Sequence, residues 1–200
     1  MGWTGMRERD KAIVTDLERF RVLTRDDIAE LHFSGLRNPV REANNALLRL
    51  RREGHIAVSK ERRKYTYFPM PSIKKDSAKI GHFLAIAEFF RQLRRIEEPR
   101  RFEVEPKYGK GRPEPDAFVI WKATPWFIEI QRTVFSERVI KEKLDRYEAY
   151  FHSGEWERAD WQPAKKIFPV VWISGVGSYT GIQQVGAFEL CKAKRKTFSE

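Results

Sequence analysis

The stretch PDAFVIWKATPWFIEIQ, residues 115–131, decides the fold class expected for the second half of the chain. It holds two apolar segments, 115–121 and 125–131, whose length and aromatic and β-branched composition are typical of buried strands. Each segment carries one acid among apolar neighbours, Asp116 and Glu129. A carboxylate in such a strand is unfavourable unless it is paired, hydrogen-bonded or bound to a cation. The stretch therefore predicts an acidic site on two consecutive strands.

The hydrophobic periodicity on either side of this stretch predicts the remaining elements of the second half. A long amphipathic helix is expected over 77–95 and a strand over 101–106. A second helix is expected from Ser136 to about Phe151, a strand over 167–173, and a last helix within 179–194. The order helix, three strands, helix, strand predicts an α/β layer fold.

The first part of the chain has a different pattern. Apolar residues at helical spacing predict helices over 8–20 and 39–53, and Thr24 has the character of an N-cap that opens another helix between them. Alternating segments at 55–58 and 64–68 predict two strands joined by a charged turn. Three helices followed by a hairpin is the order of a winged helix-turn-helix.

A short proline-containing segment separates the two patterns. Pro69 and Pro71 disfavour both a helix and a central strand at this point. We therefore predict an α+β or α/β chain with a winged helix-turn-helix domain over 1–75 and an α/β domain over 76–200.

The charge of the chain indicates a polyanionic partner. The 200 residues include 39 Lys and Arg against 28 Asp and Glu, a formal net charge of +11. Residues 1–75 carry 17 basic and 10 acidic side chains, so the excess is larger there. Double-stranded DNA is the partner that this balance favours, and a basic surface that serves only solubility is the alternative.

Several classes of protein are disfavoured by composition. A single cysteine, Cys191, excludes an internal disulfide framework, and the four histidines lie too far apart for a zinc motif. The sequence has no uninterrupted apolar run of about 18 residues, and its first residues lack the apolar region of a secretion signal. We therefore expect a cytoplasmic protein with no membrane partner.

On the winged-helix interpretation, the helix over 39–53 is the recognition helix and the hairpin is the wing. Arginine and asparagine form bidentate contacts with guanine and adenine edges, and basic side chains of a wing contact phosphates. The expected base-contacting residues are Arg41, Asn44, Asn45, Arg49 and Arg52. The expected phosphate-contacting residues are Lys60, Arg62, Arg63 and Lys64. The alternative is a winged helix used for protein contacts, with a solvated charged face.

The acids of the second half have the chemistry of a magnesium site. Mg²⁺ is commonly held by one or two carboxylates together with water and phosphate oxygens. Asp116 and Glu129 are the expected ligands, and the two-residue period of a strand puts Gln131 on the same face as Glu129. Glu88, in the middle of the helix over 77–95, could lean toward the same site. Such a site can activate water beside a scissile phosphate.

The same residues resemble the signature of the PD-(D/E)XK nucleases. Pro115-Asp116, then 12 residues, then Glu129-Ile130-Gln131 is similar to that pattern, with Gln where the family usually has Lys. The resemblance implies that Asp116 and Glu129 bind Mg²⁺ for DNA cleavage, that Gln131 positions water and that Glu88 is an extra ligand. Gln131 lacks the charge of a lysine ammonium. The missing charge could come from Lys107, Lys141 or Lys143.

Over residues 8–175 the chain also resembles the replication-relaxation family of Gram-positive plasmids, phages and mobile elements. Arg9-Asp10 and the segment Phe20–Thr24 resemble the opening of that family. Asp116, Glu129 and the segment from Lys143 to Tyr147 resemble its second half. The resemblance implies a DNA-binding protein of a mobile element that acts in replication, relaxation or processing of DNA.

Two other functions remain open at this point. One is a transcriptional regulator whose nuclease-like half is inactive and serves homodimerisation or DNA binding. The other is a metal-dependent nuclease. If the acids hold no metal, Asp116 is a turn residue at a strand start and Glu129 pairs with a lysine or arginine of a helix.

Overall fold

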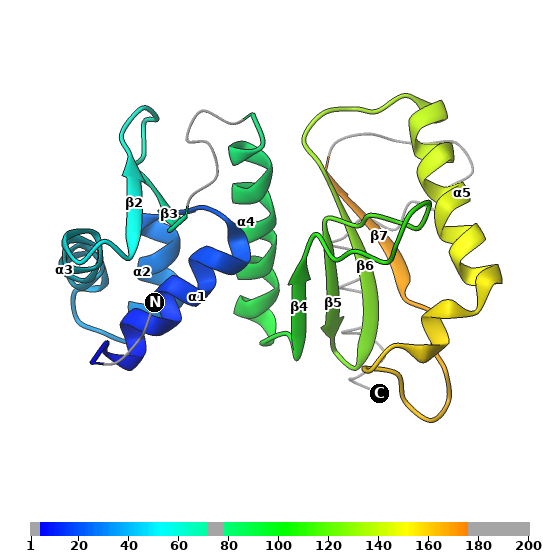
Figure 1. Cartoon of the computed structure of the whole chain (residues 1–200), viewed down its shortest axis with the longest axis horizontal. Coiled ribbons are helices and arrows are strands. Elements are labelled where there is room, and N and C mark those ends of the chain that lie inside the picture. The colour runs from blue at the N-terminus through cyan, green and yellow to red at the C-terminus, as the bar shows by residue number, and fades with distance from the viewer. Residues whose placement is uncertain (1–4, 72–77, 176–200) are drawn as a thin grey trace. The chain divides into compact units, whose positions relative to one another are not determined.

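The structure, a computed structural model, describes residues 5–71 and 78–175. The chain divides into two compact units, Met1–Ile96 (unit 1) and Glu97–Glu200 (unit 2), and each has its own sheet (Figure 1). The fold is therefore mixed α+β. No helix within the described ranges is both long and apolar enough to cross a membrane.

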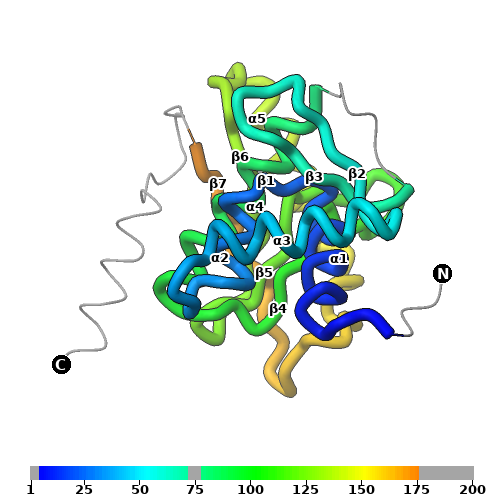
Figure 2. The backbone as a smooth tube through the Cα atoms, turned by 90° about the vertical axis from the view of Figure 1, so that its left-hand side faces the viewer, coloured from blue at the N-terminus to red at the C-terminus, as the bar shows by residue number. Residues whose placement is uncertain are grey.

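Unit 1 consists of helices around a small antiparallel sheet with the strand order β1-β3-β2. Its path from α1 to the β2–β3 hairpin can be followed in Figures 1 and 2. The elements are α1 (Glu8–Phe20), β1 (Leu23–Thr24), α2 (Arg25–Phe33), α3 (Pro39–Arg52), β2 (Ile56–Ser59), β3 (Thr66–Pro69) and α4 (Ile80–Ile96). The predicted helices and hairpin are confirmed, and the two-residue strand β1 was not predicted.

Local side-chain chemistry sets where α2 and α3 begin. The Thr24 hydroxyl accepts a hydrogen bond from the Asp27 backbone N–H, and the Asp27 carboxylate accepts one from the Thr24 N–H at 2.7 Å. This reciprocal pair is a capping box, so the predicted N-cap is confirmed. Asn38 caps α3 by accepting from the Arg41 N–H at 3.2 Å, and Pro39 occupies the first helical position.

Helix α4 belongs to unit 1, which differs from the expected boundary at residue 75. Its buried side includes Phe90, whose ring centre lies 5.2 Å from that of Phe20 in α1. Arg91 pairs with Asp27 at 2.9 Å and with Glu30, both in α2. Periodicity predicts the apolar face of a helix but not its packing partner. The sequence therefore did not show that α4 packs in unit 1 and that the boundary between the units follows it.

Unit 2 contains a four-stranded sheet with the order β4-β5-β6-β7. Neighbours are antiparallel from β4 to β6, and β7 runs parallel to β6 after the crossover helix α5. The elements are β4 (Arg101–Val104), β5 (Ala117–Trp121), β6 (Thr124–Gln131), α5 (Glu137–Ser153), the short 3₁₀ helix η1 (Glu155–Arg158) and β7 (Val170–Gly175). The predicted order of strands and helix is confirmed. The helix predicted within 179–194 lies outside the described residues.

One glycine is required where β7 ends beside β6. Gly175 pairs with Gln131 and has a φ of 139°, which side chains rarely adopt. A Cβ atom at this position would lie 2.0 Å from the Gln131 carbonyl oxygen. The absence of a side chain therefore allows β7 to approach β6 at the level of the predicted acidic site.

The sheet face that packs on α5 is aromatic. Phe118 of β5 and Phe127 of β6 are opposite one another in the ladder, and both are buried. They form a cluster with Tyr147 and Tyr150 of α5 and Trp156 of η1. Because strand side chains alternate, position 129 lies on the same face as position 127 and also points toward α5.

Candidate functional site

The two predicted acids of unit 2 are neighbours at one end of the paired strands β5 and β6. Asp116 directly precedes β5, and its backbone N–H donates to the Ile128 carbonyl at 2.9 Å. Its carboxylate accepts a hydrogen bond from the Ile130 N–H at 2.6 Å. Glu129 is 4% exposed. Burial is the main cause that raises its pKa, and the nearby charge of Asp116 acts in the same direction. Gln131, two residues further along β6, is also buried.

Both carboxylate oxygens of Glu129 are held by side chains of α5. Lys143 Nζ donates to Oε2, and the Tyr147 hydroxyl donates to Oε1 at 2.7 Å. The two donors are four residues apart, so they lie on the same face of the helix. Burial raises the pKa of Glu129, while Lys143 and then Tyr147 act in the opposite direction. Burial, and next the charge of Glu129, raises the pKa of Tyr147, which keeps its hydroxyl protonated as a donor.

This arrangement does not suit a magnesium ion. Mg²⁺ requires oxygen ligands with free lone pairs in an octahedral arrangement. Here an ammonium group contacts Glu129, and one oxygen of Asp116 accepts a backbone N–H. Among residues 5–71 and 78–175, no group of three or more His, Cys, Asp or Glu side chains is arranged to hold a metal. Magnesium binding here stays a prediction from the resemblance, and the contacts of Glu129 argue against it.

Of the three lysines that could supply the missing charge, Lys143 is the one that contacts Glu129. Lys141 pairs with Asp145 at 2.9 Å, and Lys107 pairs with Glu114 at 2.9 Å. A cavity of about 220 Å³ lies beside the Lys143–Glu129 pair. Its lining consists of Pro113, Glu114, Glu129, Lys143, Arg146 and Tyr147.

Glu88 has partners on its own helix. It lies in α4 of unit 1, whereas Asp116 and Glu129 belong to unit 2. Its carboxylate accepts hydrogen bonds from Arg91 and, at 3.0 Å, from Gln92. These contacts stabilise the charged face of α4, and the predicted role of Glu88 as an extra ligand stays a prediction.

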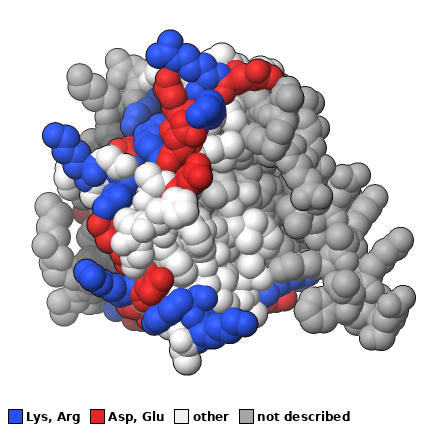
Figure 3. Space-filling view, turned by 90° about the vertical axis from the view of Figure 1, so that its right-hand side faces the viewer, with Lys and Arg blue, Asp and Glu red and all other residues white. Residues whose placement is uncertain are grey.

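The outer surface of α5 carries charges of both signs. Arg138 pairs with Glu142 at 2.8 Å and Lys141 pairs with Asp145. On the face of unit 2 seen in Figure 3, basic and acidic side chains lie along the upper left and the lower edge, around a central area of uncharged side chains. Exposed pairs such as those of α5 contribute little stability, typically below about 1 kcal/mol.

In unit 1, α3 presents a polar face to solvent. Four of the predicted base-contacting residues are exposed on it: Arg41, Asn44, Asn45 and Arg52. Leu48, an apolar residue, is 44% exposed on the same face. The core-facing side is formed instead by Ala43, Ala46, Leu47 and Leu50.

Arg49 has a partner within unit 1, and its predicted role as a DNA contact stays a prediction. Its Nε donates to Asp10 Oδ2 at 2.9 Å, and its Nη2 donates to Oδ1 at 2.8 Å. Asp10, in α1, is 3% exposed, so the pair fastens α1 to α3. Asp10 lies 39 residues away in the sequence, which is why helix periodicity alone left Arg49 on the polar face.

We predict that Arg49→Met lowers the free energy of unfolding by about 2–3 kcal/mol, because it leaves the buried Asp10 carboxylate without its bidentate partner. This range allows for the partial exposure of Arg49. The matched control is Arg52→Met, an exposed position on the same helix, which should change stability by less than about 0.5 kcal/mol. Urea denaturation of the full chain measures both. Equal losses in the two variants would contradict a structural role for Arg49.

The predicted wing residues lie in the connection between β2 and β3, and we call residues 60–65 the hairpin tip. Lys60, Arg62, Arg63 and Lys64 are all exposed. The Lys60 ammonium lies 5.4 Å from the centre of the Tyr65 ring. The exposed tip thus combines several cations with an aromatic ring.

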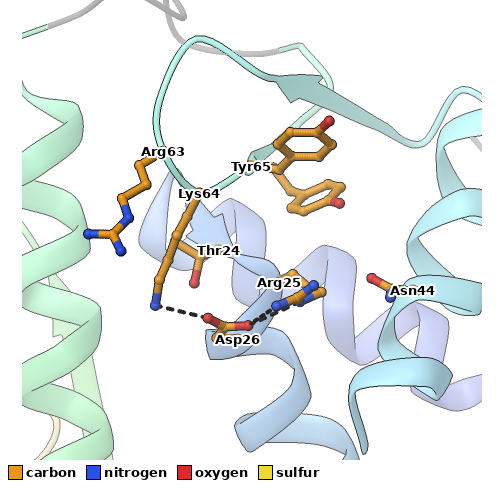
Figure 4. Close-up of a pocket in the computed structure, with 8 residues that line it drawn as sticks. Thr24, Arg25, Asp26, Asn44, Arg63, Lys64 and Tyr65 are labelled. Atoms are coloured by element: carbon orange, nitrogen blue, oxygen red, sulfur yellow. Dashed lines mark hydrogen bonds and ion pairs between the residues drawn. The ribbon is translucent and has the colours of Figure 1, made fainter.

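A cavity of about 460 Å³ opens between the hairpin tip, the start of α2 and α3 (Figure 4). Its lining consists of Thr24, Arg25, Asp26, Asn44, Arg63, Lys64, Tyr65 and Tyr67. Asn44, Arg63 and Lys64 were predicted as site residues. Arg25 and the two tyrosines were missed, although the alternation of Tyr65 and Tyr67 beside a charged turn was visible in the sequence.

Asp26 organises the basic side chains of this cavity. Figure 4 shows Lys64 and Arg25 directed at its carboxylate. The Lys64 ammonium lies 2.9 Å and the Arg25 guanidinium 2.7 Å from it. Hydrogen bonds from Lys64, and next from Arg25, lower the pKa of Asp26. Its charge therefore holds both cations at the cavity over the neutral pH range.

Comparison with known proteins gave one match. The family described as replication-relaxation matches residues 69–171, which include Asp116, Glu129, Lys143 and Tyr147. The matched range does not include α3 or the hairpin tip. Neither a curated protein nor a solved structure matches the chain. Because the family match spans more than half of the 200 residues, the chain belongs to the replication-relaxation family.

Proposed function

We propose that this chain binds duplex DNA through unit 1 and acts in the replication or relaxation of the DNA of a mobile element, such as a plasmid or phage. The observation that carries the proposal is the exposed polar face of α3 together with the cationic hairpin tip. Membership of the replication-relaxation family supports the role in replication or relaxation.

The order of elements in unit 1 supports binding as a winged helix. Helices α2 and α3 form the helix-turn-helix, and the β2–β3 hairpin is the wing. The major groove of B-DNA is about 12 Å wide and admits a helix such as α3. Arg41 suits a guanine edge, and Asn45 suits an adenine edge. Leu48 offers an apolar surface to a thymine methyl group.

The hairpin tip contacts the DNA backbone on this proposal. Lys60, Arg62 and Arg63 are exposed cations at the end of a hairpin, where a phosphate can reach them. Phosphate contacts fix the register of a protein on DNA without reading its sequence. Affinity should therefore come mainly from the tip and sequence preference from α3.

The order of three strands, a helix and a strand in unit 2 is compatible with the resemblance to the PD-(D/E)XK nucleases, although the preceding helix α4 belongs to unit 1. We propose that the acidic site of unit 2 does not cleave DNA. Lys143 and Tyr147 occupy both oxygens of Glu129, as expected of an internal ion pair. The pair joins α5 to β6 at the end of the aromatic cluster. On this proposal, the site stabilises unit 2 and supplies no metal-bound water.

Binding of the full chain to a labelled duplex, followed by fluorescence anisotropy over a salt series, tests the DNA-binding proposal. We expect binding at low salt and a linear fall of log K with log salt concentration, because phosphate contacts release counterions. A footprint confined to a defined DNA site would indicate sequence-dependent binding. Protection without a defined site would indicate binding by a merely basic surface. No binding at low salt would refute the proposal.

Incubation of the protein with supercoiled plasmid and Mg²⁺ or Mn²⁺ tests the proposal for unit 2. We expect the plasmid to stay supercoiled, because the donors around Glu129 leave a metal no free carboxylate pair. The appearance of nicked or linear plasmid would contradict this expectation. Loss of that product in Asp116→Ala would then assign the cleavage to this site and exclude a contaminating nuclease.

A further inference from the structure

The cavity of unit 1 combines two kinds of recognition chemistry. Arg25, Arg63 and Lys64 bring three cations to it, against the single acid Asp26. Tyr65 and Tyr67 bring aromatic rings, and Asn44 brings an amide from α3. Its volume of about 460 Å³ falls in the range of about 300–1,000 Å³ that is typical of small-molecule pockets. The complementary ligand is an anion that carries a planar ring.

We propose that this cavity receives one unpaired nucleotide of the bound DNA. Its phosphate lies on the side of Lys64 and Arg25, which surround Asp26 in Figure 4, and its base stacks on Tyr65 with its edge toward Asn44. The proposal rests on the DNA binding proposed above, because α3 and the hairpin tip place the duplex beside the cavity. It adds a preference for DNA with a base outside the helix, which is a form that occurs when strands separate.

The exposure of Tyr65 supports an unpaired base over a paired one. Its side chain is 48% exposed although it is a large ring, and it lines the cavity. The faces of paired bases are covered by their neighbours in the stack, so such a ring can stack only on a base that has left the duplex. Stacking of a base on an aromatic side chain contributes about 1–3 kcal/mol.

The charges of the cavity indicate that the ligand carries a phosphate. Asp26 fixes the Lys64 ammonium and the Arg25 guanidinium at one side of the cavity. Because three cations outnumber one acid, the potential there favours an anion. Tyr67 is almost fully buried and its pKa is raised by that burial, so its hydroxyl stays neutral and adds no competing negative charge.

The test compares two linear DNA duplexes of otherwise identical sequence, one fully paired and one with a single unpaired nucleotide inserted in one strand. We expect the full chain to bind the second about 5- to 150-fold more tightly, the affinity ratio that corresponds to the stacking energy. Tyr65→Ala should abolish this preference. Because Tyr65 belongs to the hairpin tip, the readout is the ratio of the two affinities within each variant. Tyr65→Phe, which keeps the ring, should retain the preference and shows that the hydroxyl is not needed.

The outcomes separate this inference from the DNA-binding proposal. Equal affinities for the two duplexes, or a preference that survives in Tyr65→Ala, would overturn the unpaired-nucleotide site and leave duplex binding intact. Absence of binding to either duplex at low salt would overturn both. Because Tyr65 is exposed, Tyr65→Ala should keep the wild-type circular dichroism and unfolding midpoint, which serve as the check on folding.

Discussion

Lys143→Met is expected to lower the free energy of unfolding by about 3–5 kcal/mol, because it removes the cationic partner of a buried carboxylate. The Glu129 side chain is 5% exposed and the Lys143 side chain 26% exposed, so solvent replaces little of the lost interaction. The Tyr147 hydroxyl remains as a donor but carries no charge. Urea denaturation of the full chain at neutral pH measures the loss.

Two further variants make this prediction specific. Lys141→Met removes an exposed lysine from the same helix, where its partner is Asp145, and should change stability by less than about 0.5 kcal/mol. Adding Glu129→Gln to Lys143→Met should restore most of the lost stability, because no buried charge is then left unpaired. Similar losses for Lys143→Met and Lys141→Met would show that the Lys143–Glu129 pair is not a structural contact.

The effect of Lys143→Met should also depend on pH. Burial raises the pKa of Glu129, so the folded state binds this proton more tightly than the unfolded state does. Stability from this group is present below its unfolded pKa and is lost as pH rises through its folded pKa. Without Lys143 the folded pKa rises further, so the deficit relative to wild type should grow from acidic toward neutral pH. A deficit that is constant with pH would contradict the pairing.

Replacing Lys60, Arg62 and Arg63 together by Ala is expected to weaken duplex binding about 10- to 100-fold at low salt. Each lost phosphate contact lowers the slope of log K against log salt by about 0.9, so the slope should fall by about 2–3. Lys64 is left in place because it pairs with Asp26 and positions Arg25 indirectly. Fluorescence anisotropy over a salt series gives both quantities.

The matched control removes the same number of charges from unit 2. Arg138, Lys141 and Lys165 are exposed there, and the first two pair with acids of α5. Their replacement by Ala should leave the affinity and the salt slope near their wild-type values. If both triple variants lose affinity equally, binding depends on net charge alone and α3 with the hairpin tip is not the interface.

Local features of the fold were predictable from the sequence. Thr24 and Asn38-Pro39 start helices through side-chain and backbone preferences that act within a few residues. The strands of the second half follow from compact apolar segments, and their order follows from the chain. The packing of α4 was not predictable, because its apolar face would fit either a sheet or other helices.

The candidate site also combines features that the sequence predicts with contacts that it does not. The nearness of Asp116 and Glu129 follows from two strands joined by a tight connection, so the sequence was sufficient. The contact of Lys143 with Glu129 depends on how the crossover helix α5 lies on the sheet. The sequence alone does not distinguish Lys143 from Lys107 and Lys141 as the partner. The contact of Arg49 with Asp10 was not predictable for a similar reason, since Asp10 lies in another helix.

The most direct test of DNA binding by unit 1 is hydrogen–deuterium exchange of the full chain with and without duplex DNA at low salt. We expect DNA to slow exchange in α3, Pro39–Arg52, and across the hairpin tip, residues 60–65, because these segments form the proposed interface. Exchange in β5, β6 and α5 should stay unchanged. Protection confined to residues 97–175, or no protection in either unit, would contradict the claim that unit 1 binds the DNA.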